Sequence, residues 1–156
     1  MAKILLIGGC GYIGSRLFQV LNDKHTIDSI DTEWYGNHVN KYNIVKDFGT
    51  LTKDEISYYD VVILLAGHSS VKMCVGNMIP TLKNNVLNFA NLLENLNKEQ
   101  TFIYASSSSV YGDTKENVVT EEYNQFEPNN YYDLSKHEID SYAKLSDTKY
   151  FGLRFG

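Results

Sequence analysis

A glycine-rich segment near the start of this 156-residue chain constrains the fold more than any other stretch. The segment 8–14 (Gly-Gly-Cys-Gly-Tyr-Ile-Gly) follows the apolar run 4–7 (Ile-Leu-Leu-Ile) and opens a helix-like stretch over 15–21. A strand that turns tightly into a helix leaves backbone N–H groups unpaired at the helix start. These donors, together with the helix dipole, attract a phosphate. The sequence therefore predicts a strand–turn–helix unit that binds an anion.

The glycines of this segment have separate expected roles. Gly8 allows the turn, Gly11 lets the backbone approach a pyrophosphate, and Gly14 lets the helix pack against the strand. Tyr12 and Ile13 lie between them and are candidate cofactor-binding residues. The spacing G-x-x-G-x-x-G matches the dinucleotide fingerprint G-x-G-x-x-G only in part, so a tight turn without a ligand is the competing interpretation.

An acidic residue at the end of the next predicted strand supports the dinucleotide interpretation. Asp31 ends the strand-like stretch 26–31, at about the distance where a carboxylate receives the adenosine ribose hydroxyls. The same carboxylate would repel a 2′-phosphate, and Thr32 and Glu33 follow it rather than Arg or Lys. This combination favours NAD over NADP.

Composition excludes several other classes of protein. The formal net charge is −5 with no basic stripe, which argues against a nucleic-acid partner. The two cysteines and four histidines fall in no metal or redox spacing, so we expect no metal site. The first apolar run is shorter than the ~7–15 residues of a signal peptide, and no run approaches the ~18 apolar residues of a membrane span. We therefore expect one cytoplasmic domain with no membrane partner.

Strand and helix patterns alternate along the chain. Predicted strands cover 3–7, 26–30, 61–65, 101–105 and 150–155, and predicted helices cover 12–21, 52–58, a long stretch from Pro80, and 131–145. The stretch 34–46 is ambiguous and ends in a possible short third strand over 42–45. The helix after Pro80 carries an apolar stripe at Leu82, Val86, Phe89, Leu92, Leu93 and Leu96. We expect an α/β fold: a doubly wound parallel sheet with strand order 3-2-1-4-5-6 and helices on both faces.

Chemistry-bearing residues follow the predicted strands. In such sheets ligands lie beyond the carboxyl ends of the strands, where 8–14, Asp31, 66–70 and 106–109 fall. In the second half, Tyr132 and Lys136 are four residues apart and share one face of a predicted helix. An ammonium near a phenol favours the tyrosinate, and a serine hydroxyl can hold a substrate oxygen. The competing interpretations are an ordinary surface pair and a solvated serine loop.

Several motifs in this order resemble the extended short-chain dehydrogenase/reductase superfamily, in its NAD-dependent epimerase/dehydratase branch. They are the glycine segment 8–14, the strand ending at Asp31, Leu-Leu-Ala-Gly at 64–67, Asn-Asn-Val at 84–86, Tyr-Ala-Ser-Ser-Ser-Ser-Val-Tyr-Gly at 104–112, Tyr-x-x-x-Lys at 132–136, and Leu-Arg-Phe-Gly at 153–156. The resemblance covers essentially the whole chain and implies a Rossmann domain over 1–156 that binds NAD.

The resemblance also implies roles for individual residues. The catalytic residues would be Ser107, Tyr132 and Lys136. Besides Gly8, Gly11, Tyr12, Ile13, Gly14 and Asp31, the cofactor would be held by Asp47 and Phe48 at adenine, by Leu65, Ala66 and Gly67 at the nicotinamide ribose, and by Asn85, Tyr132 and Lys136 at the nicotinamide. Family members pair as dimers, which implies a homodimer through the helices at 82–96 and 131–145.

Within the branch, the residues after Ser107 discriminate between reactions. Sugar 4,6-dehydratases place an Asp-Glu pair, or at least a Glu, where this chain has Ser108 and Ser109. The resemblance therefore implies a 4-epimerase of a UDP-hexose or UDP-hexuronate, working through a transient 4-keto sugar. Alternatives are a reductase, dehydratase or decarboxylase with the same residues. The family's C-terminal substrate domain is absent from this chain, so a non-catalytic NAD-binding module is a further alternative if the natural protein ends at Gly156.

Overall fold

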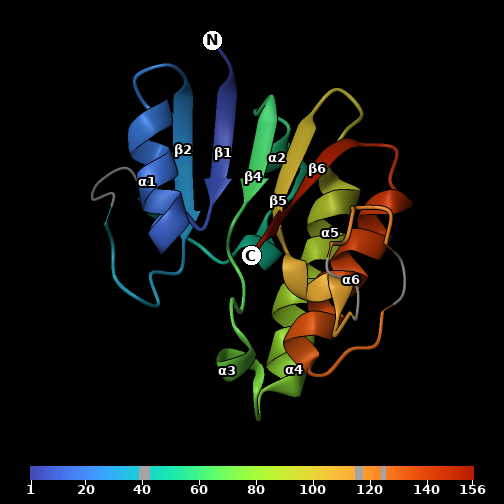
Figure 1. Ribbon diagram of the computed structural model, residues 1–156. Helices are drawn as coiled ribbons and strands as arrows, with labels where there is room; N and C mark the ends of the chain where they lie inside the picture. The colour runs from blue at the N-terminus through green and yellow to red at the C-terminus, as the bar shows by residue number, and fades with distance from the viewer. Residues whose placement is uncertain (39–42, 115–117, 124–125) are drawn as a thin grey trace.

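Six parallel strands form one sheet in the computed structural model, which describes residues 1–38, 43–114, 118–123 and 126–156 (Figure 1). The hydrogen-bonded order is β3-β2-β1-β4-β5-β6, which confirms the predicted order. The strands are β1 (Lys3–Ile7), β2 (Thr26–Asp31), β3 (Asn43–Val45), β4 (Val61–Leu64), β5 (Thr101–Ser107) and β6 (Lys149–Phe155). The predicted third strand is thus found from Asn43 onwards, and Tyr42 lies outside the described residues.

Helices lie on both faces of the sheet. They are α1 (Tyr12–Leu21), α2 (Lys53–Ile56), α3 (Val71–Cys74), α4 (Met78–Thr81), α5 (Asn88–Asn95) and α6 (Tyr131–Lys144), with 3₁₀ turns η2 (Phe48–Thr50) and η4 (Ser108–Tyr111) and a π-helical turn η3 (Leu82–Leu87). The helix predicted from Pro80 begins two residues earlier, at Met78. Proline is tolerated in a first helical turn because its missing N–H would have no partner there.

Side chains that alternate along the strands build two cores. On one face Leu5, Ile7 and Val62 pack with Phe89 of α5 and Ile139 of α6. On the other face the intervening positions, such as Ile4 and Leu6, pack against Phe18 of α1. Because both faces of the central strands are buried, β1 and β4 consist of continuous apolar runs rather than alternating ones.

The apolar stripe of the long helix belongs to the core. Its members Val86, Phe89, Leu92, Leu93 and Leu96 are buried within the molecule. These side chains therefore stabilise the domain and are not available to a second subunit. A dimer through this helix, which remains a prediction, would have to use the opposite side, where Leu87 is exposed.

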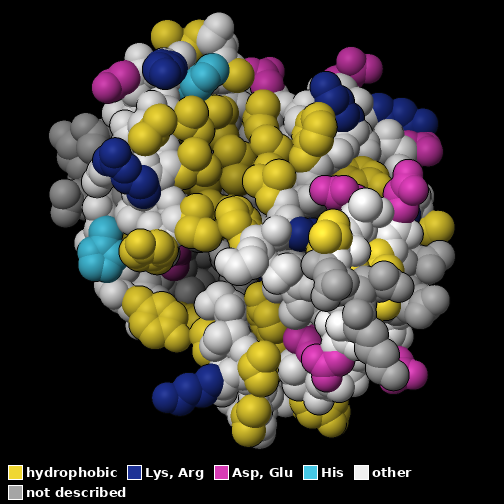
Figure 2. All heavy atoms as spheres, viewed as in Figure 1, with side chains coloured by type: hydrophobic (Ala, Val, Ile, Leu, Met, Phe, Trp, Pro, Cys, Tyr) yellow, Lys and Arg dark blue, Asp and Glu magenta, His cyan; other side chains and the backbone are white. Residues whose placement is uncertain are grey.

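Among the strands, α1 packs mainly against β1 and β2, which leaves the part of this sheet face over β5 and β6 less covered in the described residues. Phe151, Leu153 and Phe155 of the edge strand β6 are exposed there, beside the half-buried Ile103 of β5. Figure 2 shows hydrophobic side chains gathered over β1, β4 and β5 on this face. The strands of the sheet end at the same edge, where the loops that carry the predicted site residues begin (Figure 1).

Candidate active site

A cavity of about 770 Å³ opens at the carboxyl ends of the strands, within the size range of small-molecule sites. It is lined from the glycine turn, from the ends of β2, β4 and β5, and from α6. The predicted site residues on its wall are Gly8, Gly11, Tyr12, Ile13, Gly14, Asp31, Asp47, Phe48, Leu65, Ala66, Gly67, Tyr132 and Lys136. The fold therefore brings together residues that are more than a hundred positions apart in the sequence.

The glycine turn is shaped by close backbone approach. Gly8 has φ +89°, a left-handed conformation that favours glycine. A Cβ atom at Gly14 would lie 2.1 Å from the carbonyl oxygen of Gly8. Gly11 is the N-cap of α1, which has no side-chain cap and no acidic residue in its first turn. The positive end of this helix dipole therefore faces the cavity without a neutralising group at its start.

Asp31 is fixed at the rim of this turn. Its Oδ2 accepts a hydrogen bond from the Cys10 N–H at 3.0 Å, and its Oδ1 accepts one from the Glu33 N–H at 2.8 Å. A carboxylate has about four acceptor sites, so two of them remain for ligand hydroxyls. The backbone thus positions the charge before any ligand arrives.

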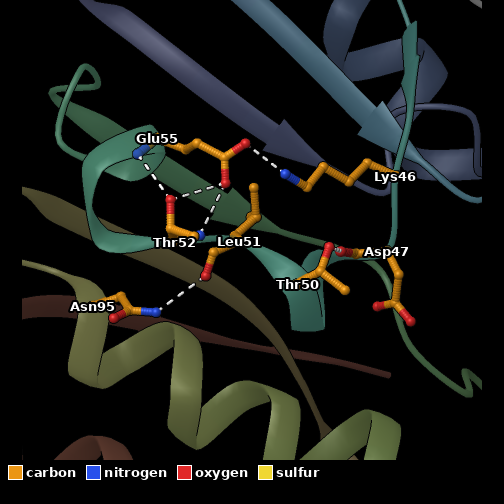
Figure 3. Close-up of polar contacts among 7 residues, drawn as sticks. All are labelled: Lys46, Asp47, Thr50, Leu51, Thr52, Glu55 and Asn95. Atoms are coloured by element: carbon orange, nitrogen blue, oxygen red, sulfur yellow. Dashed lines mark hydrogen bonds and ion pairs between the residues drawn. The ribbon is translucent and has the colours of Figure 1, made fainter.

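The segment after β3 is braced from several sides (Figure 3). Asp47 caps η2 through its Oδ1, which accepts from the Gly49 N–H at 2.9 Å, and its carbonyl oxygen accepts from the Thr50 hydroxyl at 2.7 Å. Phe48 is buried in the core, so only part of its surface can reach the cavity. Asn95 of α5 donates to the Leu51 carbonyl oxygen at 3.1 Å and ties the segment to the long helix.

A capping box stabilises the next turn of this segment. The Thr52 hydroxyl accepts from the Glu55 N–H, and the Glu55 carboxylate accepts from the Thr52 N–H at 3.0 Å. Lys46, a cavity residue, forms an ion pair with Glu55. The hydrogen bond from Lys46, with those from Thr52, lowers the pKa of Glu55 to about 2. Glu55 therefore stays ionised at physiological pH, so its ion pair with Lys46 stays charged.

Asn84, and not Asn85 for which the resemblance implied a place at the nicotinamide, lies on the cavity wall. Asn84 lines the cavity, whereas Asn85 is buried behind the wall. The Asn85 side chain accepts from the His68 N–H at 2.8 Å and donates to the His68 carbonyl oxygen at 3.0 Å and to the Ser135 hydroxyl at 3.0 Å. Both residues lie in the π-helical turn η3. Asn85 therefore links the loop after β4 to α6 instead of facing the cavity.

Lys136 and Tyr132 lie together at the opposite end of the cavity from Asp47. Lys136 is only 7% exposed, and its Nζ donates to the Ala105 carbonyl oxygen at 2.7 Å. The same nitrogen lies 5.8 Å from the centre of the Tyr132 ring. Burial lowers the pKa of Lys136 to about 8, and the Asp140 carboxylate opposes this shift. At pH 7 the side chain is therefore mainly an ammonium.

The serine run after β5 is divided between the wall and the layer beside it. Ser106 lines the cavity, is 2% exposed, and has an Oγ without a hydrogen-bond partner among the described residues. Ser107 is buried at the end of β5 and is not among the cavity-lining residues. Its Oγ accepts from the Ser109 N–H at 3.2 Å, which leaves its own proton available to a ligand.

A buried polar network behind Lys136 was not predicted. Asp140, one helical turn beyond Lys136, accepts from the Tyr104 hydroxyl at 2.9 Å and from Arg154 Nε at 3.1 Å. Arg154 also donates to the Tyr111 hydroxyl at 2.9 Å. The spacing of Lys136 and Asp140 is the one sequence signal that pointed here. Sequence reasoning also missed the cavity residues Trp34, Tyr35, His38 and Asn84.

Two further features are absent from the described part of the chain. No group of three His, Cys, Asp or Glu side chains within it could hold a metal ion. No helix in the same residues is long and apolar enough to cross a membrane.

The cavity fits a dinucleotide on its own geometry. The uncapped start of α1 offers amide donors to a pyrophosphate, and Asp31 offers acceptors to a ribose. A Cβ at Gly8 would meet the Ala66 nitrogen at 2.5 Å, so the turn and the loop after β4 approach closely along the cavity floor. The unpaired Ser106 hydroxyl lies at the end where a nicotinamide amide would require partners.

Comparison with known proteins agrees with this geometry. A model of the NAD dependent epimerase/dehydratase family matches residues 4–156. A UDP-glucose 4-epimerase of Mycoplasma genitalium is 30% identical over 178 residues, covering 98% of this chain and 52% of that protein. A dTDP-D-glucose 4,6-dehydratase of Dictyostelium discoideum is 29% identical over 178 residues, covering 91% of this chain and 40% of that protein.

A solved structure gives the same fold. The UDP-glucuronic acid 4-epimerase from Bacillus cereus, in complex with UDP-glucuronic acid and NAD, superimposes with a TM-score of 0.82 at 28% identity, covering 97% of this chain and 55% of that one. The chain thus spans about half the length of the relatives that it matches. The match along the whole chain and the shared sheet show that the protein belongs to the NAD-dependent epimerase/dehydratase family, whose cofactor is NAD.

Proposed function

We propose that this chain is the cofactor-binding and catalytic part of a nucleotide-sugar 4-epimerase acting on a UDP-hexose or UDP-hexuronate. One observation carries the proposal: Tyr132 and the buried Lys136 share one end of a cavity whose other end has Asp31 beside the glycine turn. Similarity to a UDP-glucose 4-epimerase and to the UDP-glucuronic acid 4-epimerase structure supports it.

Each catalytic residue has a role that its surroundings support. The Tyr132 phenolate takes the proton of the sugar 4-hydroxyl and later returns it. Lys136, held by the Ala105 carbonyl oxygen, supplies the positive charge that stabilises this phenolate. The Ser107 hydroxyl proton is available to the same sugar oxygen. NAD, when bound, accepts a hydride reversibly, so that C4 is oxidised to a ketone and reduced again from its other face.

The residues before Val110 favour epimerisation over dehydration. A dehydratase needs an acid for the leaving hydroxyl and a base for the neighbouring carbon. At the two positions where dehydratases place acidic residues, this chain has Ser108 and Ser109, whose hydroxyls are too weakly acidic and basic for either task. The 4-keto sugar would then persist long enough to rotate within the site and present its other face to the hydride donor.

A product analysis tests the reaction type. The protein is incubated with NAD and, separately, with UDP-glucose, UDP-N-acetylglucosamine and UDP-glucuronic acid, and products are identified by mass and by NMR. We expect a 4-epimer of unchanged mass. Loss of water would indicate a dehydratase, loss of carbon dioxide a decarboxylase, and net reduction of NAD to NADH with an oxidised sugar a reductase working in reverse. Binding of NAD without conversion of any sugar would support the non-catalytic module.

Replacement of the phenol tests the assigned proton carrier. Tyr132→Phe should lower turnover by more than ~100-fold, the scale of a lost general acid–base group. Tyr131→Phe is the matched control, because Tyr131 is adjacent, half-exposed and out of helical step with Lys136. Near-normal turnover in Tyr132→Phe, or equal losses in both variants, would remove Tyr132 from the mechanism.

We also propose a UDP-sugar partner and a homodimer through the 82–96 and 131–145 segments. The outward sides of these segments carry the exposed side chains Leu87, Tyr142 and Leu145, which suit a contact between subunits. Light scattering coupled to size exclusion measures the mass in solution. A monomer at every concentration would contradict the dimer and would leave the catalytic proposal untouched.

A further inference from the structure

Two aromatic side chains that the proposed mechanism does not use lie on the cavity wall. β2 ends at Asp31, and the chain then makes a turn over 33–36 that carries Trp34 and Tyr35. These side chains are 57% and 72% exposed, yet both line the cavity. Because so much of their apolar surface is exposed, these side chains gain little hydrophobic stabilisation in the unliganded protein. A ligand in the cavity would bury more of that surface.

The pair reaches across the glycine turn to the opposite wall. The Trp34 indole meets the His68 imidazole edge-on, with ring centres 5.4 Å apart and planes at 62°. The Tyr35 hydroxyl donates to the Met73 sulfur at 3.6 Å. His68 follows β4 and Met73 lies in α3, whereas Trp34 follows β2, and β1 lies between these two strands in the sheet. The aromatic pair therefore spans the end of β1, where the turn 8–14 begins.

The base of this turn is rigid. Glu33 has φ +58°, a left-handed conformation that is strained for a non-glycine residue. Its N–H donates to Asp31 Oδ1 at 2.8 Å, and its Oε1 accepts from Asn37 at 2.6 Å and from Asn43 at 2.9 Å. A strained conformation persists only when its surroundings hold it, as these bonds do. The position of the turn is therefore coupled to the Asp31 carboxylate.

The loop that carries His68 is also rigid, whereas the contact between His68 and Trp34 is weak. The backbone N–H and carbonyl of His68 are both bound by Asn85, and its Nδ1 lies 3.3 Å from Asn84 Nδ2. Burial lowers the pKa of His68, so its ring is neutral at pH 7. A single edge-on aromatic pair is a weak interaction, and a thioether is a weak hydrogen-bond acceptor. Because the turn at Glu33 and the loop at His68 are both held firmly, the weak Trp34–His68 and Tyr35–Met73 contacts between them can break without disturbing the fold.

We propose that Trp34 and Tyr35 are cofactor-contacting residues that form an aromatic strap over the pyrophosphate bridge of bound NAD and slow its release. The inference rests on the proposed cofactor site, since a dinucleotide extending from Asp31 to Lys136 must pass the glycine turn beneath this strap. By excluding water, the rings strengthen the hydrogen bonds between the pyrophosphate and the amides at the start of α1. The strap acts mainly on the dissociation rate.

The chain supplies its own probe, because Trp34 is its single tryptophan. Titration with NAD should change the Trp34 emission with the dissociation constant that calorimetry gives for the same protein. Release is measured by displacing NADH with excess NAD and following NADH fluorescence. Trp34→Ala should raise the dissociation rate about 10-fold, and Trp34→Phe, which keeps a smaller ring, should raise it less.

A matched control separates the strap from general effects. Tyr58 is as exposed as Tyr35 at 72% but does not line the cavity, so Tyr58→Ala should release NADH at the wild-type rate. Melting temperatures within a few degrees of wild type would establish that the variants fold, as their exposure predicts. If calorimetry shows NAD binding while Trp34→Ala and Tyr58→Ala release NADH alike, the strap is wrong and the cofactor site stands. Absence of NAD binding to the wild-type protein would overturn both.

Discussion

The two ends of the cavity owe their geometry to different parts of the chain, one to backbone contacts and the other to side chains. At the adenosine end, the geometry comes from backbone: Gly8 and Gly14 bring a strand and a helix together at distances that no side chain permits. At the nicotinamide end, it comes from polar side chains that are buried or partly buried: Lys136 donates to the Ala105 carbonyl oxygen, and Arg154 donates to Asp140. The first kind of site tolerates no added atom, whereas the second kind tolerates no lost partner.

The sharpest test of this contrast lies within the glycine turn. In Gly14→Ala the new Cβ would meet the Gly8 oxygen at 2.1 Å and the Gly9 Cα at 2.8 Å, both backbone atoms that cannot move aside. We expect a loss of more than about 4 kcal/mol in the free energy of unfolding, measured by denaturant titration. Gly11→Ala is the matched change, because its Cβ would meet only the Gly8 oxygen, at 3.4 Å.

The two variants should therefore separate folding from binding. Gly11→Ala should fold normally and lose NAD affinity, because its methyl group projects where the pyrophosphate approaches. Equal stability of Gly14→Ala and Gly11→Ala would show that the adenosine end is not limited by backbone contact.

The second prediction removes a partner at the other end. In Asp140→Asn the partly buried Arg154 guanidinium, whose side chain is 18% exposed, loses its carboxylate, which should cost about 2–3 kcal/mol of folding free energy. The exposed pair Lys98–Asp147 supplies the control, since Asp147→Asn makes the same chemical change where solvent screens it. Similar stabilities of the two variants would contradict the proposed dependence on buried partners.

The same variant has a pH signature. The pKa of Lys136 is lowered by burial to about 8, below its value in the unfolded chain, so above pH 8 the folded state binds fewer protons than the unfolded state. Its contribution to stability therefore rises with pH from about 8 up to the unfolded pKa, roughly 10.4. Asp140 opposes this lowering, so Asp140→Asn should move the start of the rise to lower pH. Stability measured across this pH range in both proteins would reveal the shift.

The smallest expected effect concerns Asp31, a charged side chain that backbone N–H groups hold at the rim of the cavity. Asp31→Arg should weaken NAD binding by about 2 kcal/mol, the scale of a lost charge-assisted hydrogen bond, and should improve binding of NADP relative to NAD. Asp28→Asn on the same strand is the control, because Asp28 is exposed and bonds to Tyr59 instead of facing the cavity. Unchanged NAD affinity in Asp31→Arg, measured by calorimetry, would remove the ribose role.

This contrast also explains what the sequence could predict. The positions of the strands, the glycine turn and Asp31 were predictable, because they follow from apolar runs and from steric rules that act within a few residues. The strand order was predictable because alternating strands and helices that bind a dinucleotide indicate the doubly wound fold. The placement of Asn84 on the wall was not, since the π-helical turn η3 inserts an extra residue into a helix of regular period. Trp34 was missed because its contact with His68 depends on the packing of distant strands.

The division between Ser106 and Ser107 shows the same limit. Motif spacing indicated Ser107, which stays the predicted catalytic serine, but it did not indicate that Ser106 lines the cavity with an unpaired hydroxyl. Successive residues of a strand point to opposite faces, so a motif that marks one serine carries no information about its neighbour. Asp140 and Arg154 were also invisible as a pair, because only the closing of β6 against α6 brings them together.

The open side of β6 has a practical consequence. Within the described residues this seven-residue strand pairs only with β5, and its free row of amides and carbonyls is flanked by Phe151, Leu153 and Phe155. Exposed edge strands of this kind pair with strands of other molecules, so this 156-residue chain should self-associate and scatter light at high concentration. The substitution Leu153→Lys would make this surface hydrophilic and should keep the protein soluble at the concentrations that the measurements above require.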